Sequence, residues 1–437
     1  MSAWISDAME IRLLNPPHID KLASKGLRFQ QAFLTSPQSS PSRTSMMTGM
    51  FAHTIGTEDL HTPIDDQTLI MPTFFKDGGY YTGTMLKKHW GENGDKQFDY
   101  VITDLRSPYE LDLTEEKYKE YENFFDQANG KPFFLWVGFN DPHRPYDRTT
   151  CPQKNDPALI PVPPYLVDGP ETRRDLADYY DEITRMDNHI GRMIEGLEKR
   201  GLMENTIIVF LSDNGMPFPR SKGSLYDSGI QTPLIFMWKN KINEGAVHAN
   251  GLISSIDLAA TLLDCAGISK PDHMYGESFK KILFNPELRG REYIFAERNW
   301  HDTDEYIRCI RTEKYKLIYN AYYELPHGTA TDLSTSPSWC ELKKKQRSEG
   351  LHKNQMQIFT APRPMVEMYD LEKDPYELDN VADLEEYVRE GEELAKILVD
   401  WQQETKDHPW WTRRRGDRSD RVTGFPFPNR RSEMWGN

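Results

Sequence analysis

Hydrophobic runs alternate with helical periodicities along the chain as far as about residue 270. This is the pattern of a parallel β-sheet covered by helices. Apolar runs at 132–140 (PFFLWVGFN) and 206–215 (TIIVFLSDNG) predict buried strands. Apolar residues between them recur at spacings of three and four and predict one face of a helix: Leu176, Tyr180, Ile183, Met186, Ile190, Met193 and Leu197. Gly201 is a suitable stop for this helix, and the order strand, helix, strand predicts a right-handed crossover unit.

The same pattern continues for two more elements. The run at 232–238 (TPLIFMW) predicts another strand. The segment 254–267 (SSIDLAATLLDCAG) predicts a helix, which its final glycine closes. We therefore expect residues 1–285 to form one α/β unit.

A different pattern begins after about residue 285. Alternating positions at 305–320 predict antiparallel strands, and 383–403 predicts a helix that packs on them. Residues 286–406 are therefore expected to form a smaller C-terminal unit with an antiparallel sheet and a packed helix. The segment 407–437 is basic and rich in glycine, proline and arginine, so we expect a solvated or loosely docked tail.

Composition limits the classes of partner. The chain has 437 residues and a net charge of -15, which argues against nucleic acid, because phosphate binding relies on an excess of lysine and arginine. An anionic substrate would need a local cluster of cations. The cysteines have no CxxC spacing: Cys151, Cys265, Cys309 and Cys340. No apolar run approaches the roughly 20 residues that span a bilayer, and residues 1–15 have no signal-peptide core.

Polar residues directly after the predicted strands are the first candidates for a site, because ligands of open α/β sheets bind at the carboxyl ends of the strands. Asp213 and Asn214 come after the strand at 206–215, and their side-chain oxygens suit Ca²⁺ or Mg²⁺. The alternative is a tight Asn-Gly hairpin. Pro217 and Pro219 argue against it, because proline cannot donate to a strand ladder.

Four more side chains add candidate anion-binding or acid/base groups. His143 comes after the strand at 132–140 and titrates near neutral pH, although a lone histidine is usually structural. Lys87 and His89 end a strand-like run at 79–91, and alternation in an extended segment would direct both to one face. The alternative for them is a solvated basic turn. Lys222 lies in a Gly/Ser-rich loop, where an ordinary exposed lysine is the simpler interpretation.

The segment 39–49 (SSPSRTSMMTG) could be a Ser/Pro-rich surface loop that leads into a helix. It also resembles the motif of the type I sulfatase family, in which a Cys or Ser is followed by Pro, Arg and a Thr-Gly pair. A serine hydroxyl needs activation to act as a nucleophile. In this family the first residue of the motif, here Ser39, is oxidised to formylglycine (3-oxoalanine) by a maturase, and its hydrate attacks sulfur. Arg43 matches the arginine that holds this group.

The resemblance extends through five motifs in the family's order, as far as 369–383 (YDLEKDPYELDNVAD). It implies an alkaline-phosphatase-like sulfatase sandwich with a mostly parallel central sheet. It also implies metal ligation of Ca²⁺, or of Mg²⁺, by Asp213 and Asn214. The remaining matched residues are implied to bind sulfate or transfer protons: Lys87, His89, His143 and Lys222.

Within the family, the chain is similar to the N-sulfoglucosamine sulfohydrolases, the heparan sulfamidases, in 212–229, 133–146 and 401–411. This implies hydrolysis of N-sulfated glucosamine in heparin-type glycans. Two residues depart from that branch, which has Cys where this chain has Ser39 and Arg where it has Lys222. Lysine is usual in ester-cleaving sulfatases, so an O-sulfate ester of a glycan is the alternative substrate.

Type I sulfatases begin with a central strand that ends in an Asp-Asp pair, which supplies two more metal ligands. Asp7 is the only aspartate among residues 1–14. The segment 16–26 (PPHIDKLASKG) resembles the family segment that comes just after that strand. One expectation is that the natural start lies upstream, with a signal peptide and the two aspartates, which would make the protein periplasmic or extracellular. The other is a catalytically impaired homologue that binds sulfated glycans. A phosphoryl-transfer hydrolase of the alkaline phosphatase type is a further alternative.

Overall fold

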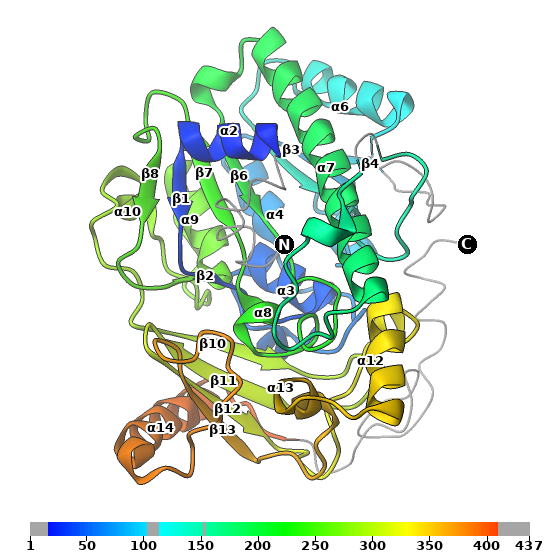
Figure 1. Cartoon of the computed structure of the whole chain (residues 1–437). Coiled ribbons are helices and arrows are strands. Elements are labelled where there is room, and N and C mark those ends of the chain that lie inside the picture. The colour runs from blue at the N-terminus through cyan, green and yellow to red at the C-terminus, as the bar shows by residue number, and fades with distance from the viewer. Residues whose placement is uncertain (1–15, 103–112, 152–153, 410–437) are drawn as a thin grey trace.

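The computed structural model describes residues 16–102, 113–151 and 154–409. Figure 1 shows an α/β part above and a four-stranded sheet below, with helix α3 (Ser39–Thr48) between them in this view. The tail predicted at 407–437 and the segment 1–14 lie almost entirely outside the described residues. Among the residues described, no helix is long and apolar enough to cross a membrane.

A parallel three-stranded sheet forms one half of the α/β part. Its order is β4 (Tyr100–Ile102), β3 (Tyr81–Leu86), β5 (Phe133–Gly138). The strand predicted at 132–140 is therefore confirmed as β5. Helix α6 (Glu115–Ala128) packs on this sheet, and it begins where the side chain of Thr114 accepts a hydrogen bond from the Lys117 amide.

A second sheet has the order β6 (Ile207–Leu211), β7 (Leu234–Trp238), β1 (Leu27–Phe29), β8 (Ala246–His248). The strands predicted at 206–215 and 232–238 are confirmed as β6 and β7, but β7 runs antiparallel to β6 and to β1. A parallel neighbour needs a long crossover, usually a helix. The connection from β6 to β7 contains only the one-turn helix α8 (Asp227–Ile230), and the chain returns in the opposite direction.

Strands β5 and β6 each pair on one side only among the residues that the structure describes. Their side chains nevertheless pack into the same two cores. Leu135 and Phe210 contact one apolar core, whereas Trp136 and Val209 contact the other. The two sheets therefore continue each other across shared core layers, although within the described ranges no hydrogen bonds between β5 and β6 join them directly.

The long helix between these strands is α7 (Pro170–Lys199), which starts earlier than the apolar pattern indicated. All seven residues of the predicted stripe are buried: Leu176, Tyr180, Ile183, Met186, Ile190, Met193 and Leu197. The helix ends at Lys199, and its C-cap Arg200 is followed by Gly201, whose φ of 68° lies in the left-handed region.

The C-terminal sheet is antiparallel throughout, in the order β10 (Tyr293–Arg298), β11 (Ile307–Thr312), β12 (Tyr315–Asn320), β13 (Val366–Asp370). Helix α14 (Val388–Glu404) covers one face (Figure 1). Its Trp401 stacks on Phe295 with ring centroids 4.8 Å apart. The α/β class with a C-terminal antiparallel sheet and helix is thus confirmed.

The remaining elements are short and connect these sheets. The other α-helices are α2 (Pro17–Lys25), α4 (Met71–Asp77), α5 (Glu92–Asp95), α9 (Leu258–Cys265), α10 (Lys280–Phe284), α11 (Thr331–Ser334), α12 (Pro337–Ser348) and α13 (Lys353–Met356). Strands β2 (Ala32–Phe33) and β9 (Ile253–Ser254) form a parallel pair. The 3-10 turns are η1 (Ala52–Ile55), η2 (Pro157–Leu159), η3 (Met203–Asn205), η4 (Ser255–Asp257), η5 (Gln357–Phe359) and η6 (Glu385–Tyr387). The helix predicted at 254–267 is realised as η4 and α9.

A buried lysine ties the C-terminal sheet to the α/β part. Lys316 on β12 is fully buried, and its Nζ lies 2.5 Å from Asp227 Oδ1 and 2.5 Å from Glu377 Oε1. It also donates a hydrogen bond to the Leu225 carbonyl oxygen at 3.0 Å. Removing one partner of a buried ion pair leaves an uncompensated charge in a medium of low dielectric constant.

We therefore expect Lys316→Met to lower the free energy of unfolding by about 3–5 kcal/mol. Lys314→Met is the matched control, because Lys314 is 47% exposed and its pair with Glu372 is 3.5 Å long. An exposed pair of this kind contributes at most about 1 kcal/mol. Urea denaturation followed by circular dichroism measures both, and equal losses in the two variants would contradict the assignment.

Candidate active site

Ser39 is the first residue of helix α3, and every residue of this helix is buried. Ser39 itself is 3% exposed. The alternative of a surface loop at 39–49 is therefore wrong. The helix ends at Thr48, and its C-cap is Gly49, whose φ of 66° is left-handed and whose amide donates a hydrogen bond to the Ser45 carbonyl oxygen. The fold thus places the candidate nucleophile at the buried amino end of a helix.

Arg43 lies one turn along α3 and joins the helix to two strand ends. Its Nε donates to Asp213 Oδ2 at 2.7 Å, and its Nη1 donates to the Lys87 carbonyl oxygen at 2.7 Å. Gly138, at the end of β5, leaves room for this guanidinium, because a Cβ on Gly138 would lie 2.5 Å from Arg43 Nη1. Arg43 therefore holds the ends of β3 and β6 in a fixed relation to α3.

The Ser39 hydroxyl has two polar neighbours from these strand ends. It donates to Asn214 Oδ1 at 3.0 Å, and it accepts from Lys87 Nζ at 3.3 Å. Lys87 Nζ is also 4.0 Å from Asp213 Oδ2. The residues predicted from the sequence as nucleophile, cation and metal ligands thus lie together at the carboxyl ends of β3 and β6.

The segment after β3 directs its side chains differently from a regular strand. Leu86 and His89 have φ angles of 65° and 80°, so the alternation expected of an extended segment does not apply. Lys87 nevertheless reaches Ser39, whereas Lys88 Nζ binds Asp95 Oδ2 at 2.6 Å. Burial, followed by the charges of Lys87 and Arg43, holds the pKa of His89 well below its usual range. His89 is therefore neutral beside these cations.

His143 and Lys222 form a second group with a residue that the sequence patterns did not single out. His143 Nε2 lies 3.5 Å from Lys222 Nζ, and Lys222 Nζ lies 2.5 Å from Asp332 Oδ2. His143 Nδ1 is 2.5 Å from the Arg144 carbonyl oxygen, so Nδ1 carries a proton and Nε2 is the nitrogen that titrates. Lys222 is buried, so the alternative of an exposed lysine is wrong.

Charges around the second group favour a neutral imidazole and an ionised carboxyl group. Burial and then Lys222 and Lys87 hold the pKa of His143 well below its usual range. Burial alone would raise the pKa of Asp332, but Lys222 and His143 hold it below its usual range. An anion bound beside His143 would offset the two lysines and raise the pKa of the imidazole.

Asp332 and His301 were missed because neither has a spacing that indicates chemistry. Asp332 is in the one-turn helix α11 of the C-terminal part, about a hundred residues from Lys222 in sequence. His301 lies just after β10 and is 3% exposed. The pKa of His301 is held well below its usual range by burial and then by the charge of Lys222, which places it near this group.

The described residues do not complete a calcium site. Asp213 and Asn214 provide oxygens of the right chemistry, but Ca²⁺ takes about six to eight oxygen ligands. Within the described ranges no three His, Cys, Asp or Glu side chains gather as ligands. Burial alone would raise the pKa of Asp213, but Arg43 and Lys87 hold it below its usual range, so these cations already balance its charge.

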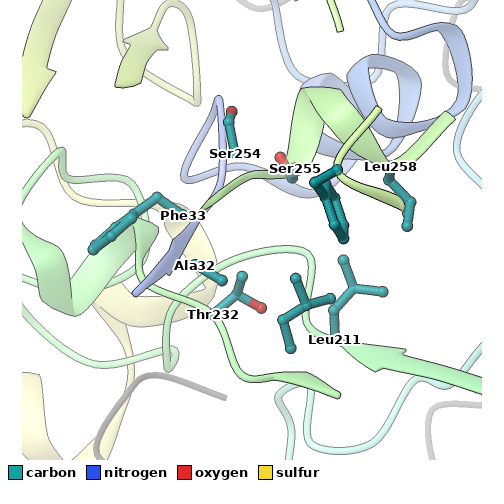
Figure 2. A pocket seen from close by; sticks show the side chains of 9 residues that line it. Ala32, Phe33, Leu211, Thr232, Ser254, Ser255 and Leu258 are labelled. Carbon is teal, nitrogen blue, oxygen red and sulfur yellow. The ribbon is translucent and has the colours of Figure 1, made fainter. Parts of the chain in front are cut away.

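Figure 2 shows a pocket that is lined by apolar and hydroxyl-bearing side chains. None of its lining residues is charged: Ala32, Phe33, Leu211, Thr232, Leu234, Ser254, Ser255, Leu258 and Phe279. Two of its hydroxyl groups serve the backbone, because Ser255 Oγ accepts from the Thr35 amide and Thr232 Oγ1 accepts from the Ser212 amide. A sulfate group would find no cation here, so this pocket is not the candidate site.

The chain matches two described families. Residues 5–268 match the family described as Sulfatase. Residues 220–361 match the family described as N-sulphoglucosamine sulphohydrolase, C-terminal. The first match contains Ser39 and its neighbours at the ends of β3 and β6, and the second contains Lys222 and Asp332.

Individual relatives agree with these matches. An ulvan-active sulfatase of Formosa agariphila is 30% identical over 423 residues, which cover 88% of this chain and 70% of the relative. The N-sulphoglucosamine sulphohydrolase of Homo sapiens is 29% identical over 437 residues, which cover 90% of this chain and 86% of the relative. A solved structure in complex with its substrate D-glucosamine-2-N,6-O-disulfate superposes with a TM-score of 0.71 at 19% identity and covers 93% of this chain and 96% of that one.

The family match at 5–268 spans more than half of the 437 residues. The first relative extends the likeness across both the α/β part and the C-terminal sheet. The hydrolase chemistry of the family also agrees with a buried serine that is held between a lysine and an amide. The chain belongs to the sulfatase family.

Proposed function

We propose that this protein hydrolyses the N-sulfate group of a glucosamine in a heparin-type glycan, with a nucleophile formed at Ser39. The observation that carries the proposal is the position of Ser39 Oγ, 3.3 Å from Lys87 Nζ and 3.0 Å from Asn214 Oδ1. His143 and Lys222 provide a titratable imidazole and a second cation nearby. These are the groups that hydrolysis of a sulfate needs: a nucleophile, cations and a proton donor.

The choice of substrate is supported by the relatives. The human relative is named as an N-sulphoglucosamine sulphohydrolase. The superposed structure holds D-glucosamine-2-N,6-O-disulfate, which carries both an N-sulfate and an O-sulfate and so agrees with either candidate. An O-sulfate ester of a glycan is the second candidate. It is supported by the ulvan-active relative and by Lys222, which stands where the N-sulfoglucosamine branch has arginine.

In this proposal Ser39 is converted to formylglycine, whose hydrate would supply the oxygen that attacks sulfur, and Lys87 and Asn214, which contact the Ser39 hydroxyl, would hold this group. Because Ser39 is 3% exposed, we propose that the maturase acts before the chain folds. Lys87 and Lys222 bind the sulfate oxygens and stabilise the charge that develops on them. Arg43 keeps Lys87 and Asp213 in position. His143, protonated at Nε2 once the anion is bound, gives its proton to the leaving nitrogen.

Ser39→Ala should lower kcat for sulfate release by at least about a thousandfold, because the nucleophile is lost. Ser42→Ala is the matched control, since Ser42 is buried in the same helix and its hydroxyl has no hydrogen-bond partner among the described residues.

Protein made together with a serine-acting maturase should show the mass of formylglycine at Ser39 in the tryptic peptide. A fully active protein with unmodified serine at this position would refute the proposal.

His143→Ala should lower kcat by about a hundredfold or more for N-sulfoglucosamine, because the leaving nitrogen then lacks its proton donor. The kcat for a sulfate ester with a good leaving group, such as 4-nitrocatechol sulfate, should fall much less, since its leaving oxygen needs no proton. His273→Ala is the control, because His273 is exposed. Equal losses on both substrates would exclude the role as an acid.

A further inference from the structure

The carboxylate of Asp332 is an unexpected component of a site for sulfate. Its Oδ2 lies 2.5 Å from Lys222 Nζ and 3.8 Å from His143 Nε2. Lys222 and His143 are the two groups that we assign to sulfate and to the leaving group. A negative charge at this position repels a bound sulfate and weakens its attraction to Lys222. Some other property of the ligand must therefore favour a carboxylate here.

The second oxygen of this carboxylate is available for a hydrogen bond. Asp332 Oδ1 is buried and has no hydrogen-bond partner in the described structure. Nδ1 of His301, which is 97% buried, is also without a partner there. Asp332 Oδ1 is one of several buried polar atoms without a protein partner among the described residues, and it is distinguished from the others because its carboxylate also contacts Lys222 and lies 3.8 Å from His143 Nε2. Asp332 Oδ1 can accept a hydrogen bond from a donor on the ligand, and His301 Nδ1 suits a hydroxyl group of the ligand.

N-sulfates offer a hydrogen-bond donor at the bond that breaks, and sulfate esters do not. A sulfamate carries an N–H on the atom that leaves, whereas the bridging oxygen of an ester carries no hydrogen. Hydrolysis breaks the S–N bond and forms an S–O bond with oxygen from water, and the nitrogen gains both protons of that water. The products are sulfate and a protonated amine. The leaving group of an ester departs instead as a neutral alcohol.

We propose that Asp332 is a specificity-determining residue that binds the leaving nitrogen, as the N–H of the sulfamate and as the ammonium group of the product. This inference rests on the proposed function. Asp332 lies 3.8 Å from His143 Nε2, the proposed proton donor, so the nitrogen that receives the proton lies within reach of the carboxylate. The positive charge that develops on nitrogen is balanced by Asp332, and Asp332 stays ionised because Lys222 and His143 lower its pKa.

Equilibrium binding tests this inference without turnover. D-glucosamine, in a mildly acidic buffer where its amine is protonated, should bind the wild-type chain roughly tenfold more tightly than neutral N-acetyl-D-glucosamine, a difference typical of a charge-assisted hydrogen bond. Asp332→Asn keeps an oxygen for Lys222 but removes the charge, and it should abolish the difference. Ser334→Ala, an exposed site in the same helix, is the control and should keep it. The inference would be overturned if Asp332→Asn still bound D-glucosamine more tightly than N-acetyl-D-glucosamine. It would also be overturned if the wild-type protein bound the two sugars equally.

Kinetic measurements distinguish two roles of Asp332, because the residue could bind the leaving nitrogen or could only hold Lys222 in position. In Asp332→Asn, kcat/KM for N-sulfoglucosamine should fall about tenfold relative to that for glucosamine 6-sulfate. Equal losses on both substrates would mean that Asp332 only positions Lys222, and the inference would be wrong. If the matured wild-type protein hydrolyses neither sugar, the proposed function fails, and the binding experiment still decides whether Asp332 recognises an ammonium group.

Discussion

A guanidinium buried at the ends of two strands is the interaction on which the rest of this site depends. Arg43 is 5% exposed, and a buried charge is tolerated only when it is paired and hydrogen-bonded. It pairs with Asp213 and binds the Lys87 carbonyl oxygen, so helix α3, strand β3 and strand β6 must meet in one arrangement. The Ser39 hydroxyl then lies between Lys87 and Asn214. Gly138 has no side chain, and this leaves the space that the Arg43 guanidinium occupies.

Carboxylates in the site offset most of the positive charge of its lysine and arginine side chains, in a chain whose net charge is -15. Asp213 lies beside Arg43 and Lys87, and Asp332 lies beside Lys222. The site therefore does not attract anions through a large positive field. Its selectivity comes from where each cation and each carboxylate lies relative to the atoms of the ligand, and the C-terminal part contributes one of those carboxylates.

Several elements could be predicted because their signals are local. The seven-residue stripe of α7 results from helical spacing, and β5 and β6 result from continuous apolar runs. The antiparallel direction of β7 could not be predicted, because an apolar run is the same in either direction and only the path of 212–233 decides between them. The expected alternation of Lys87 and His89 was wrong, because two left-handed residues bend this segment. The Lys87 side chain nevertheless reaches Ser39, and the charges of Lys87 and Arg43 act on His89.

The sequence by itself determined the α/β class, the motif at 39–49 and the polar residues just after the strand ends, because these depend on neighbours within a few positions. Only the tertiary structure decided that Ser39 and Lys222 are buried, and that the Asn-Gly pair after β6 makes no hairpin. It alone brought Asp332 to Lys222 across about a hundred residues. The physical reason is that a carboxylate has no sequence periodicity, and its partner is set by how the C-terminal sheet packs on the α/β part.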